Sequence, residues 1–347
     1  YHKKMEQCET LLFQNKQTGE SLIMPSIRDV AKKAGVGIGT VSRTLNGSGY
    51  VSEETRKKIY SIMEEMNYNP GSTLRTSSGR KTGLVGVIVP SLEHPFFARM
   101  MRCIEFELSR HDYKCIACNT IDIMNRQIEF MDMLEKKAVD GLIACVDPVP
   151  GFTGRNGKAI VSMDRYWSGD VPLIRSDHEQ GGRTAAEIFL RDGCRKVIQF
   201  YGGLDRKKSA NIRHEVMEQV LRENGCEVIS VNMEWDAMSY AYNKNIILKY
   251  WDIIRDTDGC MTNDIGALSC LAVARKMGLA IPEQFKIIGY DGTEITNLTY
   301  PELSVVEQDC PALAKECVDA VLQLIQNKEP ESMLRIVPIH WRERGTT

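Results

Sequence analysis

The stretch from Ser26 to Arg43 constrains the fold more than any other part of this 347-residue chain. Its apolar residues recur at the i, i+3, i+4 and i+7 positions of one helical face, at Ile27, Val30, Ala31 and Ala34. Gly35 then ends the predicted helix, because glycine readily adopts the left-handed conformation needed where a helix turns off. A second short helix is expected to begin near Ile38, after a turn of three or four residues.

The second predicted helix has an apolar face and a face that is free for a partner. Val41 and Leu45 form its inner face. Its outer face carries Ile38, Gly39, Ser42, Arg43 and Asn46. Two short helices joined by a glycine-containing turn are typical of a helix-turn-helix, which presents its second helix to the DNA major groove. An ordinary helical hairpin inside a helical domain is the alternative that spacing alone leaves open.

A third helix is predicted to follow from Val51, with Ser52 as its N-cap residue. Its apolar stripe consists of Ile59, Ile62, Met63 and Met66, which would close a three-helix core, and the segment 67–70 ends it. Residues 24–82 carry ten Lys and Arg against five Asp and Glu, although the whole chain has a net charge of -2. A basic segment on an acidic body favours a polyanionic partner, and a solvated basic face is the alternative.

These residues resemble the headpiece of the lactose-repressor/galactose-repressor (LacI/GalR) family of bacterial transcription regulators. The matching positions are Ile27, Asp29-Val-Ala, Ala34-Gly-Val, Thr40-Val-Ser-Arg, Asn46, Val51-Ser-Glu-Glu-Thr-Arg and Asn67-Tyr-Asn-Pro. Later segments match the same family's core, so the resemblance covers nearly all of 24–342.

The resemblance implies which headpiece side chains reach DNA. Ile38, Gly39 and Arg43 occupy positions that face base edges, and an arginine can fork onto guanine O6 and N7. The implied phosphate contacts, which position the helix without reading sequence, are Thr40, Ser42, Asn46, Ser52 and Thr55, and Ile27 belongs to the same surface. One headpiece buries too little surface for tight binding, so we expect a homodimer on a pseudo-palindromic operator.

Residues 71–82 form a small, polar, basic linker. In the family this region is a hinge that folds on DNA and wedges a leucine into the minor groove, which kinks the duplex. Ser77 occupies the expected leucine position in this chain. Either Leu74 takes the wedge role in an altered register, or this hinge bends DNA less.

From Leu84 onward, short apolar runs alternate with amphipathic stretches. The strand candidates are 84–89, 114–118, 141–145, 159–163, 196–200, 228–231, 259–262 and 285–289. The helix candidates begin at Phe96 and Asn125, cover 184–191, pass through Val216 and Leu221, and cover 239–254 and 266–277. Repeated βα units of this length predict doubly wound parallel sheets, and two such sets predict two lobes.

The predicted fold is therefore a small all-α helix-turn-helix domain plus an α/β core of two lobes, as in periplasmic binding proteins. The predicted domains are an extension over 1–23, a DNA-binding domain over 24–70, a hinge over 71–82 and a core over 83–342. Lobe 1 is expected to comprise about 83–176 and 309–337, and lobe 2 about 177–308 and 338–342. Met24 is expected to be the natural initiator, with 1–23 a start-site artefact or disordered. A genuine extension with its own contact is the alternative.

Ligands bind at the carboxyl ends of the strands in such sheets, and two facing lobes form a cleft there. By the family motif, the effector contacts are Phe96, Phe97, Asp164, Arg213, Trp235, Asn263, Asp291 and Gln308. Taken singly, an Asp or Asn after a strand is more often a turn or a helix cap, and Asp264 is expected to cap the next helix. Trp235 alone would be a core residue, and Phe96 and Phe97 would anchor a helix.

Carboxylates, amides and one arginine suit a polyhydroxylated neutral ligand such as a sugar, and they would also suit a nucleoside-like one. The expected function is an effector-controlled transcription regulator, most often a repressor, acting in the cytoplasm without a cofactor or a metal. The alternatives are an enzyme, for which no hydrolase, P-loop or zinc-protease motif is present, and a sugar-binding protein without a role in transcription. No apolar run is long enough to span a bilayer. The 11 scattered cysteines indicate reduced thiols more than disulfides.

Overall fold

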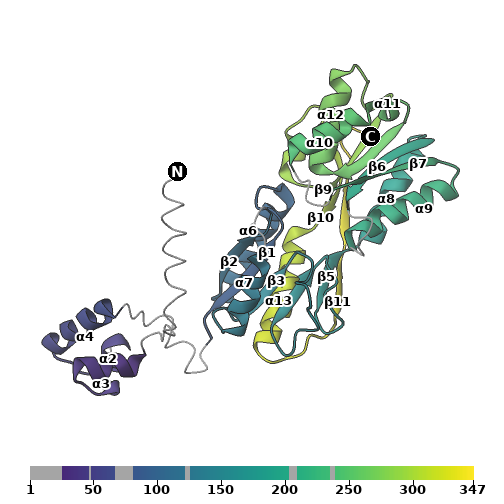
Figure 1. Ribbon diagram of the computed structural model, residues 1–347. Coiled ribbons are helices and arrows are strands. Elements are labelled where there is room, and N and C mark those ends of the chain that lie inside the picture. The colour runs from purple at the N-terminus through teal and green to yellow at the C-terminus, as the bar shows by residue number, and fades with distance from the viewer. Residues whose placement is uncertain (1–25, 47, 67–80, 122–125, 203–208, 235–238) are drawn as a thin grey trace. The chain divides into compact units, whose positions relative to one another are not determined.

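The computed structural model describes residues 26–46, 48–66, 81–121, 126–202, 209–234 and 239–347. These residues belong to two compact units that divide between Arg80 and Lys81. The first unit contains the three helices α2 (Ile27–Ala34), α3 (Ile38–Asn46) and α4 (Glu53–Glu65), which Figure 1 shows in purple and blue. The predicted extension over 1–23 and most of the predicted hinge lie outside the described residues.

Helix α2 begins and ends where the sequence predicted. The Ser26 backbone N–H donates to the Asp29 carboxylate at 2.8 Å, and the Ser26 hydroxyl accepts from the Asp29 backbone N–H, which forms a capping box. Gly35 ends the helix with φ of 71°, in the left-handed region that favours glycine. The Ser52 hydroxyl caps α4 by accepting the Thr55 backbone N–H. These caps fix the boundaries of the short helices.

The three helices share one small apolar core. Its buried members are Val30, Ala31, Ala34, Val41, Ile59, Ile62 and Met63. Burial of each valine, isoleucine or methionine side chain contributes roughly 1.5–3 kcal/mol, so these few residues supply most of the stabilisation of a unit this small.

The first lobe of the second unit contains a six-stranded parallel sheet in the order β11-β5-β4-β3-β1-β2. The strands are β1 (Leu84–Val89), β2 (Lys114–Asn119), β3 (Gly141–Ala144), β4 (Ile160–Met163), β5 (Leu173–Ser176) and β11 (Leu334–Val337). Helices α6 (Pro95–Ser109) and α13 (Cys310–Ile325) cover one face, and α7 (Arg126–Glu135) covers the other. Because side chains alternate along a strand, Val87 packs with the first cluster and Ile88 with the second.

The second lobe repeats this plan in the order β12-β10-β9-β8-β6-β7. The strands are β6 (Lys196–Gly202), β7 (Glu227–Met233), β8 (Gly259–Asn263), β9 (Lys286–Asp291), β10 (Ser304–Gln308) and β12 (Ile339–Arg342). The helices are α8 (His178–Arg191), α9 (Ile212–Glu223), α10 (Tyr240–Lys249), α11 (Trp251–Ile254) and α12 (Asp264–Lys276), with the short 3-10 helices η1 (Ser209–Asn211) and η2 (Glu294–Asn297). Strand β12 runs antiparallel to β10, whereas the sequence predicted parallel sheets throughout.

The chain passes between the two sheets at three points, after β5, after β10 and between β11 and β12. The first two crossings are joined by a hydrogen bond of 2.7 Å between the side chains of Ser176 and Gln308. The last residues pack in the second lobe, beyond the predicted limit at 342. There the Thr346 hydroxyl accepts from the Ser304 backbone N–H at 2.8 Å and donates to the Ile287 carbonyl at 2.7 Å.

Several elements differ from their sequence-based predictions. The predicted helix over 239–254 is two helices, α10 and α11, with Tyr250 between them. The short strands β5, β10, β11 and β12 were not predicted, because each carries a charged or titratable residue (Arg175, Glu307, Arg335 and His340) that interrupts the apolar run. Helix α13 was also missed, although its buried residues do follow a helical period.

Candidate nucleic-acid interface and ligand cavity

Helix α3 presents the face that the sequence assigned to DNA bases. The Ile38 side chain is 46% exposed, and Gly39 and Arg43 are exposed as well, whereas Val41 is fully buried against the helical core. The Arg43 Nε donates to the Gly39 carbonyl of the preceding turn at 3.1 Å. This bond holds the guanidinium against its own helix, and its terminal nitrogens remain available as a fork for a base edge.

The other predicted DNA contacts lie on several parts of the headpiece. Thr40 and Ser42 are half-buried on α3, and Ile27 is half-buried against the helical core. The Ser52 hydroxyl caps α4 and lies 2.7 Å from the Thr55 hydroxyl. The headpiece surface also exposes Arg28, Lys32, Lys33, Lys57 and Lys58. The side chain of Asn46, and the residues Leu74 and Ser77, lie outside the described residues.

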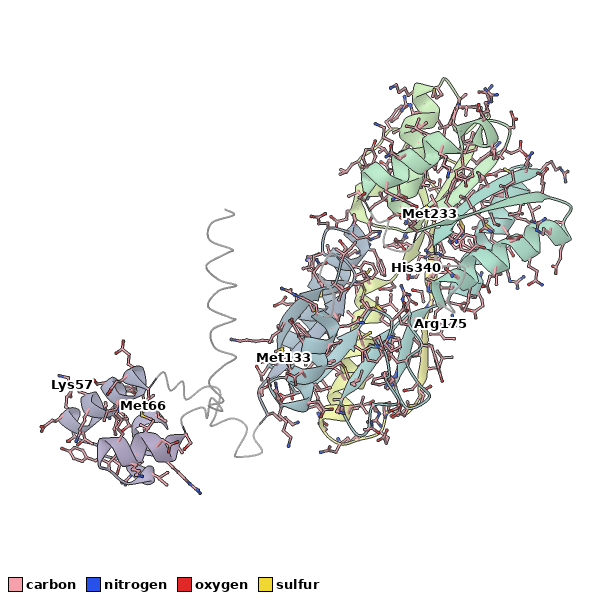
Figure 2. The ribbon with its side chains drawn as sticks, viewed as in Figure 1. Lys57, Met66, Met133, Arg175, Met233 and His340 are labelled. Atoms are coloured by element: carbon pink, nitrogen blue, oxygen red, sulfur yellow. The ribbon has the colours of Figure 1, made fainter. Side chains whose placement is uncertain are left out.

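The second unit encloses a cavity of about 110 Å³ between its two lobes. Of the eight predicted effector residues, seven line this one cavity: Phe96, Phe97, Asp164, Arg213, Asn263, Asp291 and Gln308. The eighth, Trp235, lies outside the described residues. Figure 2 labels the cavity-lining Met233, at the end of β7 in the second lobe. Since about 10–15 Å³ suffices for one water molecule, the cavity has room for a small polar ligand.

Phe96 and Phe97 serve both of the roles that the sequence left open. They lie in the first turn of α6, line the cavity, and pack edge to face with ring centroids 5.2 Å apart. Both also belong to the buried cluster of the first lobe. They therefore anchor the helix and give the cavity an apolar wall.

The polar wall of the cavity is formed by side chains at or after strand ends, together with Arg213 of α9. The Gln308 amide donates to Asp291 at 2.7 Å, and the Arg213 guanidinium lies 3.7 Å from the same carboxylate. The Arg213 guanidinium also lies 4.0 Å from the centroid of the Tyr290 ring. Asp164 and Asp291 have positive φ angles, 56° and 116°. Such strained backbone conformations recur at ligand-binding positions.

Asn263 takes the helix-capping role that the sequence predicted for Asp264. The Asn263 side chain caps α12 by accepting the Gly266 backbone N–H at 2.8 Å. The Asp264 carboxylate, which was expected to be the cap, accepts bonds from the Thr293 backbone N–H at 2.7 Å and the Thr293 hydroxyl at 2.6 Å. The prediction for Asp264 was wrong because this buried carboxylate anchors the loop after β9. Asn263 still lines the cavity.

Burial and neighbouring charges shift the pKa values of the titratable groups of the cavity in different directions. Burial, and secondarily the charge of Arg213, lower the pKa of His94 to about 4, so this imidazole is neutral at pH 7. Burial raises the pKa of Asp291 to about 6, and burial together with Asp291 raises that of Asp264. Burial alone would raise the pKa of Asp164, but nearby His178, Arg165 and Arg213 outweigh it and lower that pKa. The cavity therefore combines carboxylates and guanidiniums without a large excess of either charge.

Several residues in the cavity wall or behind it were not among the predicted effector contacts. His94 and Arg165 line the cavity, and His178 and Tyr290 lie immediately behind its polar wall. The Nδ1 atom of His94 is buried without a hydrogen-bond partner among the described residues. Its sequence signal was its position directly before Pro95 and the two phenylalanines. His178 and Tyr290 had no comparable signal, because isolated polar residues near strand ends are usually structural.

Two further observations concern membrane-spanning helices and cysteines. Within the described residues, no helix is both long and apolar enough to cross a membrane. The ten cysteines that the structure describes are all free thiols, and burial raises the pKa of most of them, for example that of Cys115 to about 11.

Comparisons with known proteins agree with this geometry. Residues 26–71 match the model of the bacterial regulatory proteins of the lacI family, and residues 186–347 match that of a periplasmic binding protein-like domain. The sucrose operon repressor of Pediococcus pentosaceus is 33% identical over 309 residues, which cover 87% of this chain and 93% of that protein.

Comparison with solved structures indicates the same family. The lac repressor dimer bound to operator and the anti-inducer ONPF is 25% identical, with a TM-score of 0.68 over 93% of this chain and 98% of that chain. A periplasmic binding protein/LacI transcriptional regulator from Alkaliphilus metalliredigens, complexed with D-xylulofuranose, is also 25% identical, with a TM-score of 0.68 over 76% of this chain and 99% of that chain. This chain therefore belongs to the LacI family of bacterial regulatory proteins and is a DNA-binding transcription regulator, not an enzyme.

Proposed function

We propose that the cavity between the lobes binds a sugar and that its occupancy controls binding to operator DNA. The observation that carries this proposal is the convergence of seven predicted effector residues on one cavity. Carboxylate oxygens accept hydrogen bonds from hydroxyl groups, and guanidiniums donate hydrogen bonds to sugar oxygens. Aromatic rings pack on the apolar face of a sugar ring. The sugar in the related A. metalliredigens complex supports the same ligand class.

The balance of charge in the cavity favours a neutral ligand over an anionic one. Asp164 and Asp291 oppose the guanidiniums of Arg165 and Arg213, and His94 is neutral at pH 7. A phosphate group would meet the two carboxylates as well as the two guanidiniums, so the cavity offers no net positive charge to hold an anion. The orphaned Nδ1 of His94 would gain a partner from a ligand hydroxyl, since a buried polar atom without a bond costs about 1–3 kcal/mol.

On the DNA side, we propose that the chain acts as a homodimer on a pseudo-palindromic operator. The related lac repressor structure, which is a dimer bound to operator, supports this proposal. Arg43 and Ile38 would read base edges, and Thr40, Ser42, Asn46, Ser52 and Thr55 would contact phosphates. The proposed domain limits are those predicted from the sequence, with the second lobe extended past residue 342 to include Thr346, and the proposed location is the cytoplasm. Leu298 and Tyr300 are 81% and 87% exposed in the single chain, which suits a surface covered in the dimer.

Ligand binding and DNA binding must affect each other reciprocally in such a protein. If a sugar weakens operator binding by some factor, the operator weakens sugar binding by the same factor. The proposed activity is repression, relieved or reinforced by the sugar, and the direction follows from which interlobe arrangement the sugar stabilises.

Titration calorimetry across D-ribose, sucrose, D-fructose, cellobiose and the purine hypoxanthine tests the ligand class. We expect one of the sugars to bind and hypoxanthine not to bind. Binding of hypoxanthine alone would overturn the sugar proposal in favour of a nucleoside-like ligand. Selection of bound duplexes from a random pool tests the DNA side, and a pool without enrichment would contradict it.

A further inference from the structure

One buried histidine joins the two lobes behind the cavity. His178 is the first residue of α8, immediately after the chain leaves the first lobe, and its side chain is completely buried. Its Nε2 lies 2.9 Å from Oδ1 of Asp164, which follows β4 of the first lobe. Its Nδ1 lies 3.1 Å from the hydroxyl oxygen of Tyr290, on β9 of the second lobe. Both ring nitrogens are therefore occupied, one by each lobe.

We infer that His178 is a positioning residue, which holds the Asp164 carboxylate as a hydrogen-bond acceptor for the ligand and ties that carboxylate to Tyr290. This inference rests on the proposed sugar site. It concerns a residue that does not line the cavity and so acts through Asp164.

The hydrogen-bond chemistry fixes the direction of the contact. A carboxylate only accepts, so Nε2 of His178 must carry a proton and donate to Asp164. In the neutral ring, Nδ1 then accepts from the Tyr290 hydroxyl. In the charged ring, Nδ1 would donate to the same oxygen. Either way, the Asp164 carboxylate keeps its charge and its orientation, and among the described residues this is the side-chain hydrogen bond that it makes.

Two consecutive glycines inside α8 support this inference independently. A Cβ atom at Gly181 would lie 2.2 Å from the Tyr290 hydroxyl, and one at Gly182 would lie 2.2 Å from the Arg213 carbonyl oxygen. Glycine inside a helix costs roughly 0.5–1 kcal/mol relative to alanine. At these two positions it allows Tyr290 to reach His178 and allows α9, which carries Arg213, to pack close to α8.

The linkage continues around the polar wall. Tyr290 lies under the Arg213 guanidinium, Arg213 faces Asp291, and Asp291 accepts from Gln308. Gln308 in turn bonds Ser176, only two residues before His178. His178 thus completes a closed ring of contacts that holds acceptors from both lobes in fixed positions. Ring closure of this kind pre-organises a site, because the ligand does not have to order these side chains itself.

The test compares variants at His178 in the full chain. His178→Leu removes both bonds, and His178→Gln retains a donor near the position of Nε2. The pKa of Asp164, measured by carboxyl carbon NMR and assigned with Asp164→Asn, should rise by about one unit or more in His178→Leu, because the anion loses its donor. It should return toward the wild-type value in His178→Gln. Gly181→Ala should displace the Tyr290 hydroxyl and so weaken its bond to His178. The pKa of Asp164 in this variant should lie between those of the wild type and His178→Leu.

Phe189→Leu is the matched control, because Phe189 is buried on the same helix outside the ring of contacts. It should lower the melting temperature and leave the Asp164 pKa unchanged. An unchanged Asp164 pKa in His178→Leu would overturn the inference. In calorimetry with D-ribose, sucrose, D-fructose and cellobiose, His178→Leu should weaken binding of the sugar that the wild type binds by about tenfold or more. If the wild type binds none of the four sugars, that result counts against the proposed sugar site, and the NMR titration still decides the role of His178.

Discussion

Arg99 of the first lobe and Glu307 of the second form an ion pair of 3.3 Å across the junction between the lobes. The same guanidinium donates to the Gly292 carbonyl at 2.9 Å, and Arg342 holds the other Glu307 oxygen at 2.6 Å. Arg99 lies on α6, the helix whose first turn carries Phe96 and Phe97. The contact between the lobes and one wall of the cavity are therefore carried by the same rigid element.

Substituting Arg99 should weaken ligand binding without unfolding the core. Arg99→Met removes the bonds to Gly292 and Glu307, so the arrangement of the lobes that these bonds stabilise becomes less populated and sugar affinity should fall about 3–10-fold, or roughly 1 kcal/mol. Calorimetry measures the affinity, and small-angle scattering should show a larger radius of gyration. Arg102→Met, at an exposed position of the same helix, is the control. Equal affinities for the two variants would refute a role for the Arg99 contact.

Arg43 should determine sequence discrimination at one symmetric base pair of the operator. Arg43→Ala is expected to lose about 1–3 kcal/mol of discrimination there, because the bidentate contact with guanine is gone. Binding to random pools of duplexes, sequenced after selection, measures this preference. Lys57→Ala removes an exposed cation of α4 and should leave the preferred sequence unchanged. An Arg43→Ala protein that selects the wild-type sequence would contradict the assignment.

Destabilising the buried core of the headpiece should abolish operator binding without affecting ligand binding by the second unit. Ile59 is fully buried, and Ile59→Ala should cost about 2–5 kcal/mol, a large fraction of the stability of a small helical unit. Operator binding in a gel-shift assay should be lost, while sugar binding by the second unit persists, since the two units are compact separately. Ser61→Ala on the exposed side of α4 should affect neither. Loss of sugar binding in Ile59→Ala would show that the units do not fold independently.

His94 should make the core less stable in mild acid. Its folded-state pKa is about 4, against 6.5 for an exposed histidine. Because this pKa is depressed, the unfolded chain binds the proton first, so the stabilisation is complete above pH 6.5 and is lost as the pH falls toward 4. The loss between pH 7.5 and pH 5 should be about 2 kcal/mol. Urea unfolding of wild type and His94→Asn at both pH values measures it, and equal acid sensitivity would argue against a buried neutral His94.

Local patterns predicted most of the secondary structure. The capping residues Ser26 and Ser52, the left-handed Gly35 and the helical stripe through Ile59 depend on neighbours within four residues, so sequence alone located α2 and α4. The apolar runs of β1, β6 and β8 were equally clear. Strands with a charge in the middle, such as β10 with Glu307, were missed, because only a partner on another strand or helix offsets that charge.

The sequence by itself determined that the chain has a helix-turn-helix followed by repeated βα units, and it named seven residues that meet at one cavity. The tertiary structure decided how those residues are held. His178 and Tyr290 are more than a hundred residues apart along the chain, and they meet because α8 packs against the second-lobe sheet that contains β9. Asp264 and Asn263 are adjacent in sequence, yet the buried Asp264 carboxylate bonds Thr293 in the loop after β9, whereas the Asn263 side chain caps α12. Long-range packing, which local spacing does not encode, determines these side-chain contacts.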